Sequence, residues 1–175
     1  MTYTITIGAT NYTSYLSVAA AATILESELN TSPWDSSDVP LREKALLMAT
    51  RVVESLAFAG SKVDSTQVLQ FPRQLKLPVN SWQGVTGSVP GPTTIPSQIE
   101  RAVALMAVAF LDGIDPDIEF DNLQMIHSKY NGIEMNFGRA EYTQYKVLGI
   151  PCYSAWKLLK PFLRDGRGLS LSRVS

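Results

Sequence analysis

The chain has 175 residues, of which 45% are hydrophobic and 18% are charged, and its net charge at pH 7 is −1. This size and composition are typical of a single globular domain and exclude an intrinsically disordered chain. The near-zero net charge gives no general attraction to nucleic acid or to an anionic membrane.

The single cysteine, Cys152, leaves no internal disulfide framework and suits a reducing cytoplasm. The first residues have neither the basic nor the apolar region of a signal peptide. The longest wholly apolar run, residues 102–111, is far shorter than the ~20 residues needed to span a bilayer. We therefore expect a protein that is made in the cytoplasm and has no membrane partner.

The N-terminal residues predict a strand followed by a helix. Residues 2–7 alternate between threonine and apolar or aromatic side chains, as in a half-buried strand, and Gly8 ends the alternation. A strand at this place needs a partner strand. Ser17 is a good N-cap for an alanine-rich helix over residues 18–29.

A turn over residues 30–37, with Trp34 packed back as an anchor, leads to a second helix. Ser37 or Asp38 caps this helix, and Gly60 is expected to stop it. Its predicted buried face consists of Leu41, Ala45, Met48, Ala49, Val52 and Leu56.

The middle of the chain contains a long loop and a strongly apolar helix. Residues 74–96 hold four prolines and three glycines, which forbids a regular helix. Trp82 in this loop is either a contact residue or a side chain tucked against the helices, and both alternatives stay open. Pro96 opens a helix over residues 97–111 that is apolar on nearly every side, so we expect it at the centre of the fold.

Residues 112–121 carry five acids and no base, and we expect them to form a solvated acidic loop. Their alternating acids suggest a calcium-binding loop, but the pattern fails in detail. Phe120 stands where such a loop needs glycine, and Ile126 stands where it needs glutamate.

The last third predicts a hairpin, a helix and a tail. An Asn-Gly dipeptide between two strand-like runs predicts a β-hairpin over residues 123–138. A helix over residues 152–164 follows, and residues 165–175 have no periodic face, so we expect a flexible tail. The predicted fold is mainly α: a small helical bundle with a β-hairpin and an N-terminal strand, forming one domain over residues 1–164.

The sequence predicts no catalytic residue, no metal site and no cofactor. No phosphate-binding glycine loop, zinc-protease motif or nucleophile elbow occurs in it. His127 is the only histidine, and no cysteine or second histidine stands near it to share a metal. A small hydrolase that uses Cys152 and His127 remains an alternative, although no third group suggests itself to orient the pair.

Basic residues concentrate near the C-terminus, where Asp165 is the only acid between residues 157 and 175. These bases are Lys157, Lys160, Arg164, Arg167 and Arg173. Five such charges could give salt-sensitive, non-specific contact with phosphates, or they could meet an acidic groove on a protein partner. Both alternatives stay open.

Several short motifs, in order along the chain, resemble those of the head–tail adaptor (connector) proteins of tailed bacteriophages. They are Ser14-Tyr15-Leu16-Ser17, the turn at Trp34, the helix LREKALLMATRVVESL, the Phe71-Pro72-Arg73 motif, and Ile95-Pro96 followed by Ile99 and Ala102. The likeness covers residues 12–111 well and the C-terminal third loosely. Relatives of this kind are often labelled DnaT-like single-stranded-DNA-binding proteins, a function that the mildly acidic composition does not itself favour.

The resemblance implies a non-enzymatic virion protein at the neck of the particle, made in the host cytoplasm, that couples the portal to the tail. Its partners would be further copies of itself in a dodecameric ring, the portal protein, and a downstream tail, nozzle or stopper protein. Double-stranded DNA would pass through the lumen of the ring without specific binding. A head-to-tail ring needs two unlike faces on each subunit, which the acidic residues 112–121 and the basic residues 157–175 could supply.

The residues expected to bind partners lie in the tail, the hairpin and the long loop. They are Arg164, Arg167, Leu169, Leu171, Arg173, Trp82, Asn131 and Gly132. The alternative function is a single-stranded-DNA-binding module, in which the C-terminal bases would contact phosphates.

Overall fold

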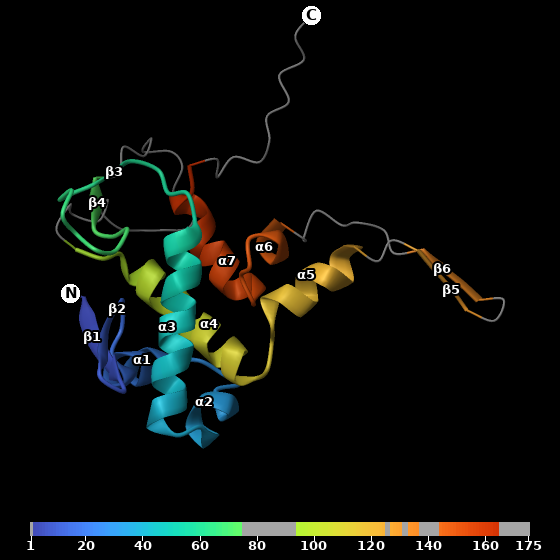
Figure 1. The fold of residues 1–175 in the computed structure, drawn as a ribbon, viewed down its shortest axis with the longest axis horizontal. Coiled ribbons are helices and arrows are strands. Elements are labelled where there is room, and N and C mark those ends of the chain that lie inside the picture. Colours follow the sequence, from blue (N-terminus) through green and yellow to red (C-terminus); the bar gives the residue numbers. More distant parts are fainter. Residues whose placement is uncertain (1, 75–93, 125–126, 131–132, 137–143, 165–175) are drawn as a thin grey trace, which may run out of the picture.

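The fold is mainly α, as the sequence predicts, with helices packed around the central helix α4 (Ser97–Leu111) and a small β-hairpin at the N-terminus (Figure 1). Most of the predicted loop 74–96 and the whole predicted tail 165–175 lie outside the described residues. The computed structural model describes residues 2–74, 94–124, 127–130, 133–136 and 144–164.

The N-terminal strand β1 (Tyr3–Ile7) pairs antiparallel with β2 (Thr10–Ser14), so that Tyr3 lies opposite Ser14. The alternation of residues 2–7 predicts β1 and its need for a partner. It does not predict that the partner is the segment directly after Gly8. Gly8 has a φ of +64°, a left-handed conformation that glycine adopts without strain and that the tight turn requires.

Helix α1 (Val18–Leu25) begins as predicted, because the Oγ of Ser17 accepts a hydrogen bond from the backbone N–H of Ala20 at 3.1 Å. The helix ends at Leu25, earlier than predicted. Leu29, the last residue of the predicted helix, therefore lies beyond it and is 90% exposed.

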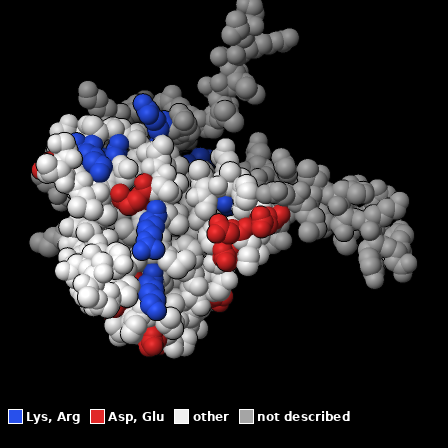
Figure 2. All heavy atoms as spheres, viewed as in Figure 1, with Lys and Arg blue, Asp and Glu red and all other residues white. Residues whose placement is uncertain are grey.

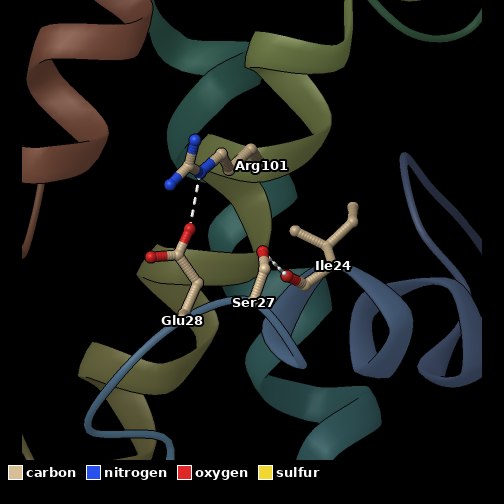
Figure 3. A network of polar contacts seen from close by, with 4 residues as sticks. All are labelled: Ile24, Ser27, Glu28 and Arg101. Atoms are coloured by element: carbon tan, nitrogen blue, oxygen red, sulfur yellow. Dashed lines mark hydrogen bonds and ion pairs between the residues drawn. The ribbon is translucent and has the colours of Figure 1, made fainter.

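The chain leaves α1 through a turn that is tied to α4 (Figure 3). The Oγ of Ser27 donates to a carbonyl of α1 at 3.0 Å, and Glu28 forms an ion pair with Arg101 of α4 at 2.5 Å. These contacts take the place of a further helical turn. The short helix α2 (Ser32–Ser36) then occupies the predicted turn segment and places Trp34 at 2% exposure, which confirms Trp34 as a buried anchor.

Helix α3 (Val39–Ser55) has the predicted cap, since the Oδ1 of Asp38 accepts from the backbone N–H of Leu41 at 2.9 Å. It ends at Ser55, and Gly60 lies in the turn beyond it with a φ of +75°. The predicted buried face is partly wrong, because Leu41 and Met48 are 47% and 46% exposed. The face against the core is rotated, and its buried residues are Ala45, Leu46, Leu47, Ala49, Thr50 and Val53.

Helix α4 has the predicted bounds and the predicted central place. It packs against α1, α2, α3 and, on another side, the C-terminal helix α7 (Tyr153–Leu159). Because neighbours surround it, a helix that is apolar on most sides is stable here. Its buried residues are Ile99, Ala102, Val103, Ala104, Met106, Ala107 and Ala109.

The predicted acidic loop is wrong, because α5 (Pro116–Gln124) is a helix. The Oδ1 of Asp115 accepts from the N–H of Asp117 at 3.0 Å, and the carbonyl of Asp115 accepts from the N–H of Glu119. Proline at the first helical position and acids in the first turn both favour a helix start. The alternation of acids therefore reflects a helix N-terminus.

The predicted hairpin is confirmed by its two paired strands, and it begins later in the chain than expected. Strands β5 (His127–Tyr130) and β6 (Ile133–Asn136) pair antiparallel, while residues 123–124 belong to α5. Asn131 and Gly132, which join the strands in the chain, lie outside the described residues.

The C-terminal helix differs from its prediction at both ends. The C-terminal helix is α7, and Cys152 is the N-cap residue of α7. A separate short helix, α6 (Gln144–Val147), precedes α7. After Leu159 the chain continues as the 3₁₀ helix η3 (Lys160–Phe162), which contains Pro161. A proline here lacks the N–H that another α-helical turn would use.

The side chain of Arg73 holds together the segment that follows α3. Its guanidinium donates to the carbonyls of Ala59 at 2.9 Å, Gly60 at 2.8 Å and Phe58 at 3.3 Å. It also donates to the Oε1 of Gln70 at 2.6 Å. Only a planar fork of donors can satisfy these acceptors together. Arg73 therefore has a structural role in the Phe71-Pro72-Arg73 motif.

Phe71 of the same motif sits in an aromatic cluster and is 1% exposed. Its ring centroid lies 4.8 Å from that of Phe58, 5.9 Å from that of Phe162 and 6.5 Å from that of Tyr15, all edge to face. These rings come from the residue directly after β2, from the segment that follows α3, and from η3. The cluster thus joins the two ends of the described fold.

Tyr15 also carries a buried polar contact. Its hydroxyl donates to the carboxylate of Glu54, which accepts in addition from the backbone N–H of Gln70 at 2.8 and 3.0 Å. Burial, and then the hydrogen bond and charge of Glu54, raise the pKa of Tyr15 far above its usual value of 10.0. The hydroxyl is therefore a permanent donor at physiological pH.

Replacing Arg73 by lysine keeps the charge but removes the fork. We expect Arg73→Lys to lower the free energy of unfolding by about 1.5–3 kcal/mol, measured by urea denaturation followed by circular dichroism. The control is Lys44→Arg on the exposed face of α3, which should change stability by less than about 0.5 kcal/mol. Equal losses in the two variants would contradict the role of the fork.

The raised pKa of Tyr15 predicts a pH dependence of stability. As pH rises through about 10, the unfolded chain loses this proton while the folded chain keeps it, so the folded state becomes less stable. We expect the wild type to lose more stability than Tyr15→Phe between about pH 9 and 11 in the same urea experiment. Parallel curves for the two proteins would show that Tyr15 titrates normally.

Candidate nucleic-acid interface

A basic stripe runs along the outer face of α7 and η3. Lys157, Lys160 and Arg164 are all exposed, and we use the name basic stripe for these three residues. Lys157 and Lys160 are three residues apart at the end of α7, which places them on one side of it. Arg164 follows the 3₁₀ helix and the extended residue Leu163, so helical spacing does not set its direction. The opposite side is the packed one and contains Ala155, Trp156, Leu159 and Phe162.

The end of the basic stripe is fixed by backbone hydrogen bonds to the segment after α3. The N–H of Arg164 donates to the carbonyl of Ala57 at 2.9 Å, and the N–H of Ala59 donates to the carbonyl of Phe162 at 2.8 Å. Phe58 and Leu163 form the β-bridge between these bonds. The Arg164 side chain therefore extends from a backbone position set by the core.

Two tyrosines lie at the other end of the basic stripe. Tyr153 is one helical turn before Lys157 and is 47% exposed. Its ring centroid lies 5.9 Å from that of Tyr145 of α6, edge to face. Proteins that bind single-stranded nucleic acid combine basic side chains, which contact the phosphates of the nucleic-acid backbone, with aromatic rings on which the nucleobases stack. Tyr153 and the three basic residues of the stripe supply both components.

Lys146 of α6 is close by but is engaged elsewhere. Its ammonium forms an ion pair with Glu119 of α5, and that hydrogen bond raises the pKa of Lys146. Figure 2 shows acidic side chains gathered over α5. Lys146 therefore balances an acidic helix and adds no free charge to the basic stripe.

An apolar groove lies beside the basic stripe, between the end of α3, α6 and α7. It has a volume of about 340 Å³, and its walls include Leu56, Leu148, Trp156 and Leu163. Leu148 is 40% exposed and its neighbour Val147 is 58% exposed. Exposed apolar side chains around a groove are typical of a surface that contacts another molecule.

Of the residues that the sequence predicts as partner-binding, Arg164 is exposed at the end of the basic stripe. The others lie outside the described residues, and they are Trp82, Asn131, Gly132, Arg167, Leu169, Leu171 and Arg173. Lys157 and Lys160 belong to the predicted basic concentration, and the structure brings them onto one face. Tyr153 was missed, although its spacing of four residues from Lys157 could have indicated it.

The cysteine of the hydrolase alternative is not activated. Burial raises the pKa of the Cys152 thiol, so it holds less thiolate at neutral pH than a free cysteine. Within the described part of the chain, no three His, Cys, Asp or Glu side chains are grouped so that they could hold a metal ion. Among the described helices, none combines the length and the apolar character needed to cross a bilayer.

Comparison with known protein families gives one match that spans nearly the whole chain. The family described as "Putative DnaT-like ssDNA binding protein" matches residues 2–174. The chain belongs to this family. The match confirms the DnaT-like part of the resemblance seen in the sequence and does not test the phage adaptor part. No protein with a curated description and no solved structure matches the chain.

Proposed function

We propose that this protein binds single-stranded DNA, with the basic stripe as its phosphate contact and Tyr153 as a stacking surface. The observation that carries the proposal is the exposure of Tyr153, Lys157, Lys160 and Arg164 close together along the C-terminal segment, with Tyr153, Lys157 and Lys160 at helical spacing. Membership of a family described as single-stranded-DNA-binding supports it independently.

The chemistry fits contact that does not depend on base sequence. Lysine and arginine side chains neutralise phosphates and release counterions, so affinity falls as salt rises. A tyrosine ring accepts any base by stacking, because every base has a π-face. The net charge of −1 gives little long-range attraction, so binding depends on the local charge of the basic stripe.

The proposal is tested by fluorescence anisotropy with a labelled oligo(dT) strand over a range of salt concentrations. We expect Lys157→Ala/Lys160→Ala to weaken binding at low salt by roughly tenfold and to reduce the slope of log K against log salt by about 1.4, since each contact with a single strand contributes about 0.7. The matched control is Lys44→Ala/Arg51→Ala, which removes two exposed bases of α3.

Two outcomes of this experiment count against the proposal. The first is the absence of salt-sensitive binding by the wild type. The second is an equal loss in both double variants, which would mean that total charge governs binding and that the basic stripe has no special part.

A second candidate function is the head–tail adaptor of a tailed phage, coupling portal to tail as a subunit of a ring. It is favoured by exposed apolar side chains in α5, at the end of α6 and directly after it, which suit contacts with protein. They are Ile118, Phe120, Val147 and Leu148. The order of the Phe71-Pro72-Arg73 and Ile95-Pro96 motifs supports it as well. Portal, neighbouring subunits and a downstream tail component would be its partners.

The adaptor candidate is tested in a phage that encodes this chain, by deleting residues 165–175. We expect heads that package DNA but fail to join tails, counted by electron microscopy of the lysate. The control is the reinstated wild-type sequence. Normal numbers of tailed particles, or the absence of the protein from intact particles, would rule the candidate out.

A further inference from the structure

The apolar groove beside the basic stripe has mainly aliphatic walls. It lies where the segment after α3 meets α6 and α7 (Figure 1). Of the described residues that line it, none carries a charge. Its volume of about 340 Å³ is at the lower end of the roughly 300–1,000 Å³ that is typical of ligand pockets. The groove therefore suits one or two bulky side chains of a partner.

Basic side chains border one edge of the groove. Lys160 follows the wall residue Trp156 by one helical turn, and Arg164 directly follows the wall residue Leu163. Lys160 and Arg164 are both exposed. The carbonyl of Ala57, another wall residue, accepts the backbone N–H of Arg164 at 2.9 Å. The groove thus combines apolar walls with a positively charged edge.

The opposite edge of the groove is apolar and open to solvent. Val147 of α6 is 58% exposed, and Leu148 directly after α6 is 40% exposed. Lys146 of α6 forms an ion pair with Glu119 of α5, so each charge is balanced by the other. A partner that covers this edge would remove two aliphatic side chains from water, which is favourable.

A nucleobase fits this groove poorly. The polar edge of a base needs hydrogen-bond partners when it is buried. Among the described wall residues, only Gln144 and Trp156 have side chains that form hydrogen bonds, and Trp156 is only 8% exposed. The aliphatic walls also offer no open ring on which a base could stack. They suit an aliphatic or aromatic side chain better.

We propose that this groove binds a short acidic segment of a different protein. An aliphatic or aromatic side chain of that segment would insert between the apolar walls, while its carboxylates would face Lys160 and Arg164. The charge of the edge favours an acidic partner, because opposite charges across an interface steer association and fix its orientation. This binding does not require DNA.

One consequence of the proposal rests on the proposed function. Lys160 and Arg164 also belong to the basic stripe, which is the proposed phosphate contact. A bound acidic segment and a bound DNA strand would therefore compete for the same two side chains. The acidic partner would promote release of the strand.

The size of the groove sets the expected affinity. A segment that inserts one or two side chains buries less area than the roughly 800 Å² per partner of a standard stable interface. The dissociation constant should therefore be on the order of tens of micromolar. The ion pairs at the exposed edge should also make the binding sensitive to salt.

The test is fluorescence anisotropy without DNA, using the full-length chain and a labelled synthetic peptide in which glutamates surround a Leu-Phe pair. We expect saturable binding by the wild type. Val147→Ser/Leu148→Ser removes one apolar wall at unchanged charge and should weaken binding by at least about fivefold. Lys160→Glu reverses a charge at the edge and should weaken it by at least about fivefold as well.

Matched controls separate the groove from general effects of charge and hydrophobicity. Ile118→Ser/Phe120→Ser removes two exposed apolar side chains of α5, and Lys44→Glu reverses an exposed charge of α3. Both should leave the affinity for the peptide within about twofold of the wild type. A peptide with serines in place of the Leu-Phe pair should bind at least about fivefold more weakly. Circular dichroism checks that every variant keeps its helices.

Three results with the peptide would overturn the proposal. They are the absence of saturable binding by the wild type, an unchanged affinity of the groove variant, and an equal loss in the control variants. If binding appeared only after deletion of residues 165–175, the occupant of the groove would be the chain's own tail, and the proposal would also fall.

Parallel titrations with oligo(dT) separate this proposal from the proposed function. The groove variant Val147→Ser/Leu148→Ser should keep its affinity for oligo(dT) within about twofold. If it lost affinity for oligo(dT) and for the peptide alike, the groove would be a nucleic-acid contact, which overturns the proposal. A wild type that binds the peptide but not oligo(dT) would overturn the proposed function alone.

Discussion

The guanidinium of Arg73 is the contact on which the arrangement of this fold depends. After α3 the chain reaches the two-residue strand β3 (Ser61–Lys62), which pairs antiparallel with β4 (Arg73–Gln74). The carbonyls of Phe58, Ala59 and Gly60, just before β3, need donors. Arg73 supplies these donors from one rigid group. Because this segment is thereby held in place, its own N–H and C=O groups can bind the C-terminal segment at Phe162 and Arg164. The position of the basic stripe thus depends on the hydrogen bonds that Arg73 donates to the segment after α3.

The aromatic cluster and the Tyr15–Glu54 contact extend the same constraint to the N-terminus. Phe71 touches rings from three separate parts of the chain, and Glu54 binds both the Tyr15 hydroxyl and the backbone at Gln70. Buried polar groups are costly unless they are satisfied, so this contact favours one arrangement of the hairpin, α3 and the motif. The Phe71-Pro72-Arg73 motif therefore acts as a structural centre and leaves the outer helical faces available for binding.

The net charge of −1 conceals a strong separation of charge over the surface. Acids gather on α5, while Lys44 and Arg51 are exposed on α3 and the basic stripe lies in the C-terminal segment. Such a protein can meet phosphates at one place and a protein surface at another, because charges separated by more than a Debye length act independently. The two proposed functions, binding of single-stranded DNA and contact of an adaptor with its protein partners, would therefore use different parts of the surface.

The sequence by itself determined the features that depend on neighbouring residues. The bounds of α4, the caps at Ser17 and Asp38 and the existence of the second hairpin follow from local patterns of apolar, capping and turn residues. The clustering of bases in the last part of the chain was visible in the same way. The helix α5 was missed because its acids were interpreted as solvated loop residues, although Pro116 and acids in the first turn also favour a helix start.

Only the tertiary structure decided which face of each helix is covered and which charges are free. Leu41 and Met48 have apolar side chains in a helical pattern, yet they face solvent because α4 covers the other side of α3. Lys146 is engaged because α5 brings Glu119 to it, and Arg164 is fixed because Ala57 accepts its backbone N–H. These outcomes depend on residues far apart in the chain, and periodicity within a single helix carries no information about its neighbours.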